Sequence, residues 1–193
     1  MLRFTLDRLV AFPLACLAGL ALLIAGCGDQ SGLSGHHGGD FVLQSATGPV
    51  DTRALRGSVL LIYFGYVNCP DICPASMAAG AAALNLLKPE ERARTRMIMV
   101  SVDPARDTPA LLKEYAAFFH PEMIGATGGD AEVAAVAASF GVGYRKQPPN
   151  ADGGYAVDHT SHTYVIDAAG KLAEILPLGV PPEKVAATVR GLL

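Results

Sequence analysis

The feature that most constrains the fold is a continuous apolar run, Val59–Phe64, which is followed by a helical pattern containing Pro74. The run is rich in strand-forming residues and has the length of a strand that is buried on both faces. A proline deep in a helix removes a hydrogen bond and clashes with the preceding turn. The helix that continues to Leu87 must therefore begin near Pro74, so the chain passes from a buried strand through a tight loop into a helix.

The rest of the chain repeats this alternation of strands and helices. We expect a hairpin before the first buried strand, a helix capped by Thr108, a further helix capped by Asp130, and a strand hairpin before the final helix. In chain order the expected segments are 41–50, 59–64, 75–87, 97–102, 109–119, 123–126, 130–141, the polar turn 148–154, 162–166, 171–176 and 181–193. The pattern predicts one α/β domain, residues 41–193, with a mixed central sheet flanked by helices.

The first 26 residues differ from the rest. Arg3 and Arg8 form a basic start, an apolar run follows at 9–24, and small residues precede Cys27, which together make an export signal. The run has 16 residues, fewer than the ~20 that span a bilayer. Its ending resembles the lipobox of bacterial lipoproteins, in which Cys27 becomes the lipidated first residue; the alternative is an uncleaved N-terminal anchor. Both predict a domain of the bacterial cell envelope, tethered to a membrane and facing the periplasm or the outside of the cytoplasmic membrane.

Residues 27–40 are rich in glycine and predict a flexible tether between the anchor and the domain. His36 and His37 lie in this tether. We interpret them as solvated linker residues, and a weak, mobile metal-gathering site is the other interpretation of the pair.

Charge and cysteine content exclude two classes of protein. The net charge is −3 and no block of like charge stands out, so nucleic acid is not expected as a partner. After removal of the signal and lipidation of Cys27, Cys69 and Cys73 are the remaining thiols. The loop that they would close is too small to stabilise a fold as a disulfide scaffold. We therefore expect the two cysteines to have a chemical role and not a structural one.

Pro74 also places the two cysteines. Cys69–Ile72 should form a tight loop at the carboxyl end of the buried strand, where ligands gather in open α/β sheets. Cys73 should lie at the helix N-terminus, where the helix dipole favours anions, and we expect a lowered thiol pKa there. Three residues separate the cysteines, one more than in thioredoxin-like redox proteins, which leaves room for a metal. The pair could hold one soft metal ion or oxidise to a disulfide.

The number of ligands narrows the choice of metal. Cysteine favours copper(I), zinc or an iron–sulfur cluster, but two thiolates are too few for a cluster. Structural zinc needs four protein ligands, which the two cysteines with one or two histidines could in principle supply. Copper is satisfied by two sulfurs and an imidazole. His159 and His162 lie at the entry to a late strand, on opposite faces if the segment is extended, and this pattern leaves open which of them faces the cysteines. His120 ends a helix, where we expect a cation beside the dipole.

Taken together, these motifs resemble the Sco family (also called SenC or PrrC), copper proteins of cytochrome oxidase assembly. The matches run in order through roughly residues 40–180: Leu55-Arg56-Gly57, Tyr63-Phe64-Gly65-Tyr66, Cys69-Pro70-Asp71-Ile72-Cys73-Pro74, Ser101-Val102-Asp103-Pro104-Ala105-Arg106-Asp107-Thr108-Pro109, Lys113-Glu114-Tyr115 and Val157-Asp158-His159-Thr160. The resemblance implies a thioredoxin-like fold. It also implies that Cys69, Cys73 and His159 bind one copper ion, as Cu(I), Cu(II) or both. His162 is then a strand-edge residue, with an auxiliary ligand as the alternative.

The same resemblance implies a metallochaperone, which is not an enzyme in the usual sense. It would deliver copper to the dinuclear copper site of cytochrome c oxidase, with the copper-bearing subunit as its partner. A thiol–disulfide oxidoreductase stays open: Cys69 would attack a disulfide of that site or of another exported protein, and Cys73 would resolve the mixed disulfide. A peroxide-reducing enzyme fits the paired cysteines poorly.

Three carboxylates near the cysteines are the remaining candidates. Asp71 should be exposed beside the sulfurs and could orient a partner. Asp103 and Asp107 follow a buried strand, at the same end of the sheet. We interpret them as turn and helix-cap residues, and the alternative is that they dock a partner or support the metal ligands.

Overall fold

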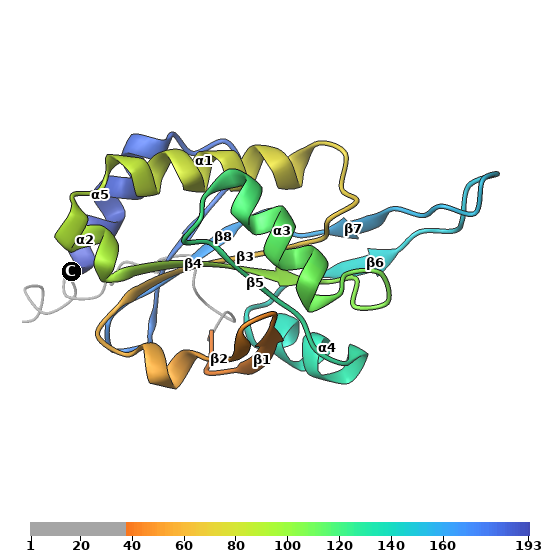
Figure 1. Cartoon of the computed structure of the whole chain (residues 1–193), viewed down its shortest axis with the longest axis horizontal. Helices are drawn as coiled ribbons and strands as arrows, with labels where there is room; N and C mark the ends of the chain where they lie inside the picture. The colour runs from red at the N-terminus through yellow and green to blue at the C-terminus, as the bar shows by residue number, and fades with distance from the viewer. Residues whose placement is uncertain (1–37) are drawn as a thin grey trace, which may run out of the picture. The chain divides into compact units, whose positions relative to one another are not determined.

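The computed structural model describes residues 38–193. The predictions for the export signal, Cys27, His36 and His37 lie outside these residues. Within them, α1 (Ile72–Leu86) and α5 (Pro182–Leu192) lie on one face of a five-stranded sheet, and α4 (Asp130–Ser139) lies on the other (Figure 1). None of the helices in the described part of the chain has the length and apolar character needed to cross a membrane.

The central sheet is mixed, as predicted. Its strand order is β5–β4–β3–β8–β9, with bounds Val59–Gly65 (β3), Thr95–Ser101 (β4), Ile124–Ala126 (β5), Thr163–Ile166 (β8) and Leu172–Leu176 (β9). β3 pairs in parallel with β4 and antiparallel with β8, so Ile62 lies opposite Ile98 on one side and Tyr164 on the other. Every residue of β3 is buried, which confirms the interpretation of the long apolar run as a central strand.

Helix starts follow the proline and capping signals closely. Thr108 caps α3 (Pro109–Phe119) by accepting a hydrogen bond from the Leu111 N–H at 3.3 Å. α1 begins at Ile72, earlier than predicted, and Pro74 stands in its first turn, where backbone N–H groups have no partner within the helix. The predicted cap of α4 was wrong by one residue, because Asp130 is already helical and Gly129 is the cap. A short helix, α2 (Pro89–Ala93), links α1 to β4.

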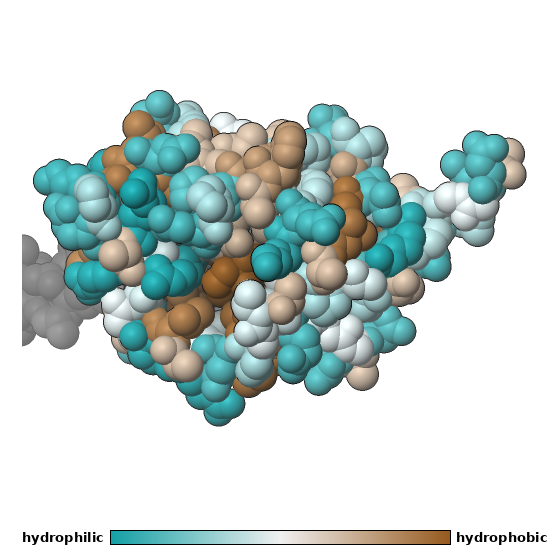
Figure 2. Space-filling view, in the orientation of Figure 1, coloured by the Kyte–Doolittle hydropathy of each residue, from teal (hydrophilic) through white to brown (hydrophobic). Residues whose placement is uncertain are grey.

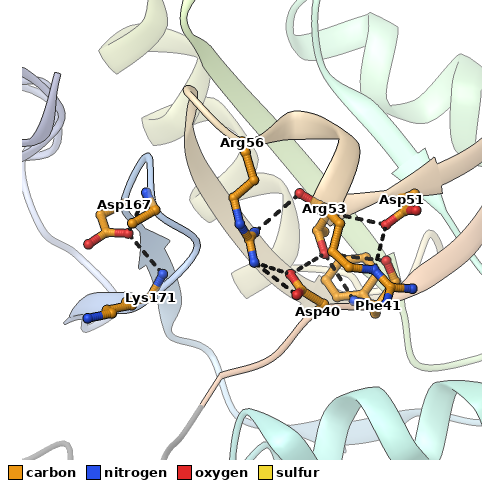
Figure 3. Close-up of polar contacts among 9 residues, drawn as sticks. Asp40, Phe41, Asp51, Arg53, Arg56, Asp167 and Lys171 are labelled. Atoms are coloured by element: carbon orange, nitrogen blue, oxygen red, sulfur yellow. Dashed lines mark hydrogen bonds and ion pairs between the residues drawn. The ribbon is translucent and has the colours of Figure 1, made fainter.

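The beginning of the described chain is held by polar contacts (Figure 3). It forms the predicted hairpin, β1 (Val42–Ser45) and β2 (Gly48–Asp51), followed by a 3-10 helix, η1 (Thr52–Leu55). The Arg56 guanidinium donates to both oxygens of Asp40 at 2.8 Å and lies against the β8–β9 turn. A Cβ at Gly170 in that turn would come within 1.9 Å of the guanidinium carbon, and the φ of +83° there favours glycine as well.

A second hairpin was not predicted in full. β6 (Tyr144–Lys146) pairs antiparallel with β7 (Val157–His159) in a sheet of its own, and the predicted polar turn lies in the loop between them. The hairpin projects beyond the carboxyl end of β3 (Figure 1), and its projecting end is covered mostly by hydrophilic residues (Figure 2). β6 escaped prediction because three polar or half-exposed residues carry no apolar pattern.

Candidate metal centre

Two cysteines and one histidine meet at the carboxyl end of β3. The ligand atoms of Cys69, Cys73 and His159 all lie within 4.8 Å of one another. The Sγ of Cys73 is 3.2 Å from Nε2 of His159, and the Sγ of Cys69 accepts a hydrogen bond from the Cys73 backbone N–H at 3.4 Å. Within residues 38–193 this is the one group of three or more His, Cys, Asp or Glu side chains with the spacing of a metal site.

The cysteine loop is a short turn between β3 and α1. The Cys69 N–H donates to the Tyr66 carbonyl at 3.3 Å, which closes the turn. Asp71 then caps α1 without using its side chain, and that side chain is exposed. Cys73 follows as the second helical residue and is fully buried, whereas Cys69 is 8% exposed. The loop therefore holds one sulfur inside the core and the other at the rim.

The pKa of the Cys73 thiol is raised, whereas the helix dipole led us to predict that it would be lowered. Burial raises its pKa to about 12, and the neighbouring Cys69 thiol contributes in the same direction. Because desolvation disfavours the charged form, it outweighs the dipole at this fully buried position. In the metal-free protein Cys73 is thus a neutral thiol at neutral pH, and a metal ion must displace its proton to bind.

His159 is presented in the form that binds metals. Burial lowers the pKa of its imidazole, which favours the neutral ring. Nδ1 lies 3.0 Å from the carbonyl oxygen of Thr160. A carbonyl oxygen can only accept, so Nδ1 carries the proton, and the lone pair of Nε2 faces the cysteine sulfurs.

Two buried tyrosines and a glycine complete the walls of the site. The rings of Tyr63 and Tyr66 meet the His159 ring edge-on, with centroids 6.1 Å and 5.8 Å away. A Cβ at Gly65 would lie 2.9 Å from the Cys73 sulfur and 2.7 Å from the Tyr63 ring. Glycine at position 65 thus allows the backbone of β3 to approach the sulfur closely.

The other two histidines of the described chain lie outside this group. His162 precedes β8 and contacts the Tyr164 ring at 6.4 Å between centroids. His120 caps the end of α3 and is buried, and its Nδ1 accepts a hydrogen bond from the Glu122 N–H at 3.2 Å. Its role as a cation beside the helix dipole stays a prediction.

Asp103 and Asp107 brace the loops around the site. Asp103 is 4% exposed, pairs with Arg106 and accepts a hydrogen bond from the Tyr155 hydroxyl at 2.8 Å. Asp107 is fully buried and accepts from the Ser101 hydroxyl at 2.7 Å and from the Val67 N–H at 3.1 Å. Burial raises the pKa of the Asp107 carboxyl. Both side chains therefore serve internal contacts instead of facing solvent.

Sequence reasoning did not identify the aromatic residues and the arginine around the site. Tyr63 and Tyr66 lie in the strand and loop before the cysteines, and Arg106 and Tyr155 link two further loops. An aromatic residue in an otherwise polar turn segment, a few residues before a candidate ligand, was the available signal for Tyr155.

Comparison with known proteins adds four findings. The family model described as SCO1/SenC matches residues 29–193. A SCO2-like protein of Rickettsia felis is 37% identical over 156 residues, which cover 80% of this chain and 76% of that protein. Among solved structures, Bradyrhizobium japonicum ScoI with copper bound superposes with a TM-score of 0.74 at 38% identity, covering 81% of this chain and 99% of the other. BsSco gives a TM-score of 0.64 at 26% identity, covering 82% of this chain and 94% of the other. It is described as having a disulfide switch and as a member of the Sco family of cytochrome c oxidase assembly proteins.

Proposed function

Because this chain belongs to the SCO1/SenC family and has the thioredoxin-like fold of its solved members, we propose that it is a copper chaperone. The predicted family and fold class are thereby confirmed. In this proposal Cys69, Cys73 and His159 bind one copper ion, which the protein passes on as cargo. The observation that carries the proposal is the convergence of two sulfurs and one imidazole nitrogen within 4.8 Å.

The donor set fits copper. Thiolates favour Cu(I), and a neutral imidazole suits both oxidation states, so His159 could stay bound through a one-electron change. Binding releases the protons of the two thiols, because thiolates are the ligand form. The buried Cys73 and the two tyrosine rings would shield the inner side of a bound ion from water. Cys69, at the rim, is the sulfur that an acceptor's thiolate reaches first in a stepwise exchange of ligands.

We infer that the acceptor is the dinuclear copper site of cytochrome c oxidase. The support is the description of BsSco as a member of a family of oxidase assembly proteins. A site that is itself built on two cysteines would keep the exchange of copper nearly balanced. The exposed carboxylate of Asp71, beside the cysteine loop, is available to orient the acceptor.

The proposed location is the bacterial cell envelope. Residues 1–26 would be a lipoprotein-type signal, Cys27 the lipidated residue, 27–40 the tether and 41–193 the copper-binding domain facing the periplasm or the outside. The support is the basic start, the apolar run and the small residues that precede Cys27.

A second candidate is a thiol–disulfide oxidoreductase, favoured by the proximity of the two thiols. The Cys69 thiolate would attack a partner's disulfide and release one partner thiol, and Cys73 would then attack Cys69, release the second thiol and leave a Cys69–Cys73 disulfide. Two electrons would pass to the partner. This exchange has no role for the imidazole of His159, which lies with the two sulfurs, and that is why we place the chaperone first.

The two candidates separate at His159. We would measure bound metal and disulfide reductase activity for the purified chain and for the variants Cys69→Ser, Cys73→Ser, His159→Ala and, as a matched control, His162→Ala. A chaperone should carry one copper, lose it in both serine variants, lose Cu(II) in His159→Ala, and keep it in His162→Ala. Copper binding that is unchanged in His159→Ala, or tight zinc binding without preference for copper, would contradict the proposal.

A further inference from the structure

The loop between β4 and α3 contacts both segments that carry the proposed ligands. On one side, Asp107 accepts a hydrogen bond from the N–H of Val67 at 3.1 Å, at the entry to the cysteine loop. On the other side, Arg106 donates to the Tyr155 carbonyl at 2.9 Å, and Asp103 accepts from the Tyr155 hydroxyl at 2.8 Å. These contacts cross 40 to 52 positions of sequence, so one loop sets the spacing of two distant segments.

Arg106 is the centre of this arrangement. Its guanidinium carbon lies 3.6 Å from the centroid of the Tyr155 ring, and its side chain pairs with the buried Asp103. The same guanidinium lies 5.7 Å from the ring of Tyr66, which itself packs edge-on against His159. Arg106 therefore contacts the hairpin and the wall of the metal site at once. We call Asp103, Arg106 and Tyr155 the hairpin clamp.

The hairpin behaves as one unit from its base to the clamp. At the base, the Thr160 N–H donates to the Gly143 carbonyl at 2.9 Å, and the Gly143 N–H donates to the Thr160 hydroxyl at 3.1 Å. In the strands, Tyr144 lies opposite His159. Near the tip, Lys146 places its ammonium 3.6 Å from the Tyr155 ring centroid. Paired strands thus connect the segment that carries Tyr155 to His159.

The hairpin needs such a clamp, because its strands do not join the main sheet. Within residues 38–193, β6 and β7 pair only with each other, and an isolated two-stranded hairpin is marginally stable in water. The cysteines, in contrast, lie on the β3–α1 connection and are buried in the core. Loss of the clamp should therefore change the position of the histidine and leave the two sulfurs in place.

We propose that Asp103, Arg106 and Tyr155 are positioning residues that hold the β6–β7 hairpin so that Nε2 of His159 reaches the two cysteine sulfurs. The inference rests on the proposed copper site. It assigns to the clamp a selective effect on Cu(II), because Cu(I) is retained by the soft thiolates, whereas Cu(II) depends more on the imidazole.

The test compares Tyr155→Phe, which removes the hydroxyl and keeps the ring, with Tyr155→Ala, which removes both, in the full chain. Asp152→Asn is the matched control, an exposed residue in the loop of the same hairpin. Cu(I) and Cu(II) affinities are measured by competition, the Cu(II) site by its electron paramagnetic resonance spectrum, and the copper-free hairpin by hydrogen exchange of the Gln147 and Thr160 amides.

Tyr155→Ala should lower Cu(II) affinity by about 10- to 100-fold, the usual range for residues that orient a ligand. Its Cu(I) affinity should fall less, its Cu(II) spectrum should change, and the two amides should exchange faster. Tyr155→Phe should lie between Tyr155→Ala and the wild type, and Asp152→Asn should match the wild type. If Tyr155→Ala does not fold, the same measurements are made on Tyr155→Phe and on Arg106→Lys. Lysine at position 106 keeps the charge but loses the planar guanidinium.

Unchanged Cu(II) affinity and spectrum in folded Tyr155→Ala would overturn the inference. So would an equal loss of Cu(I) and Cu(II) affinity with a wild-type spectrum, which indicates a general loss of stability. Failure of the wild-type chain to bind copper would contradict the proposed function alone. In that case the exchange of the Gln147 and Thr160 amides still decides whether the clamp holds the hairpin.

Discussion

The two halves of the site are built in opposite ways. The cysteine half lies between a fully buried central strand and the first turn of α1, and Cys73 has no exposed surface. The histidine half lies on a two-stranded hairpin outside the main sheet, held by side-chain contacts. We infer that stability is concentrated in the first half and adjustability in the second. Substitutions near the cysteines should therefore destabilise the whole domain, and substitutions in the hairpin should act mainly on His159.

The largest effect is expected where the cysteine loop is tied to the core. Asp107→Ala removes a buried acceptor from the Val67 N–H and the Ser101 hydroxyl. The free energy of unfolding, measured by urea denaturation, should fall by roughly 3 kcal/mol, because buried donors are left without partners. Asp71→Ala, at an exposed cap that makes no side-chain hydrogen bond to the helix, is the control and should stay within about 0.5 kcal/mol of the wild type. Equal stability of the two variants would contradict the inference that stability is concentrated in the cysteine half.

A somewhat smaller effect is expected at the close approach below the sulfur. Gly65→Ala places a Cβ within 3 Å of the Cys73 sulfur and the Tyr63 ring, both fully buried. Overpacking should cost about 1–3 kcal/mol in thermal or urea unfolding and weaken copper binding. Gly191→Ala in α5, where a Cβ meets nothing within 4 Å, should be neutral or stabilise by up to ~1 kcal/mol. An equally stable Gly65→Ala variant would mean that β3 and α1 can shift apart.

The histidine half should respond to pH. Burial lowers the pKa of folded His159 below its ordinary value of 6.5, so the unfolded chain binds the additional proton first as the pH falls. The copper-free protein should therefore lose stability from about pH 6.5 down to the folded pKa, and this contribution should be constant above that window. His159→Ala should flatten the slope of unfolding free energy against pH, and His162→Ala should retain it. An unchanged slope in His159→Ala would place the imidazole in solvent.

The smallest effect is expected at the exposed side of the hairpin. Arg145 and Asp158 pair at 3.7 Å with 78% and 64% of their side chains exposed. Because solvent and salt screen such pairs, a double-mutant cycle with Arg145→Gln and Asp158→Asn should give a coupling below about 0.5 kcal/mol. A larger coupling would show that the hairpin is stable by itself, which would contradict the difference between a stable cysteine half and an adjustable histidine half.

The same contrast explains what the sequence could predict. The buried run, Pro74 and Thr108 determine local geometry by themselves, so the central strand, the cysteine loop and the start of α3 followed from residue type and spacing. An extended segment places His159 and His162 on opposite faces, and the pattern leaves open which face meets the cysteines. The choice of His159 therefore came from family resemblance. The structure brings His159, and not His162, to the sulfurs.

The errors at Cys73 and in the β6–β7 hairpin share one physical cause, which is contact with residues distant in sequence. The predicted drop in the Cys73 pKa considered the helix end and not the core around it. β6 and the clamp residue Tyr155 carry no local pattern, since the partners that fix them lie 11 to 52 positions away.

The closed base of the hairpin has a consequence for how such a site can change over time. Gly143 and Thr160 bind each other at the point where the hairpin leaves the domain, so the intervening residues form a cassette with adjacent ends. The exposed loop of such a cassette can change in length without cutting the β3–α1 connection that presents the sulfurs, as long as Val157 keeps its place in the core. Metal preference and domain stability are then separate traits, open to independent selection and to independent design.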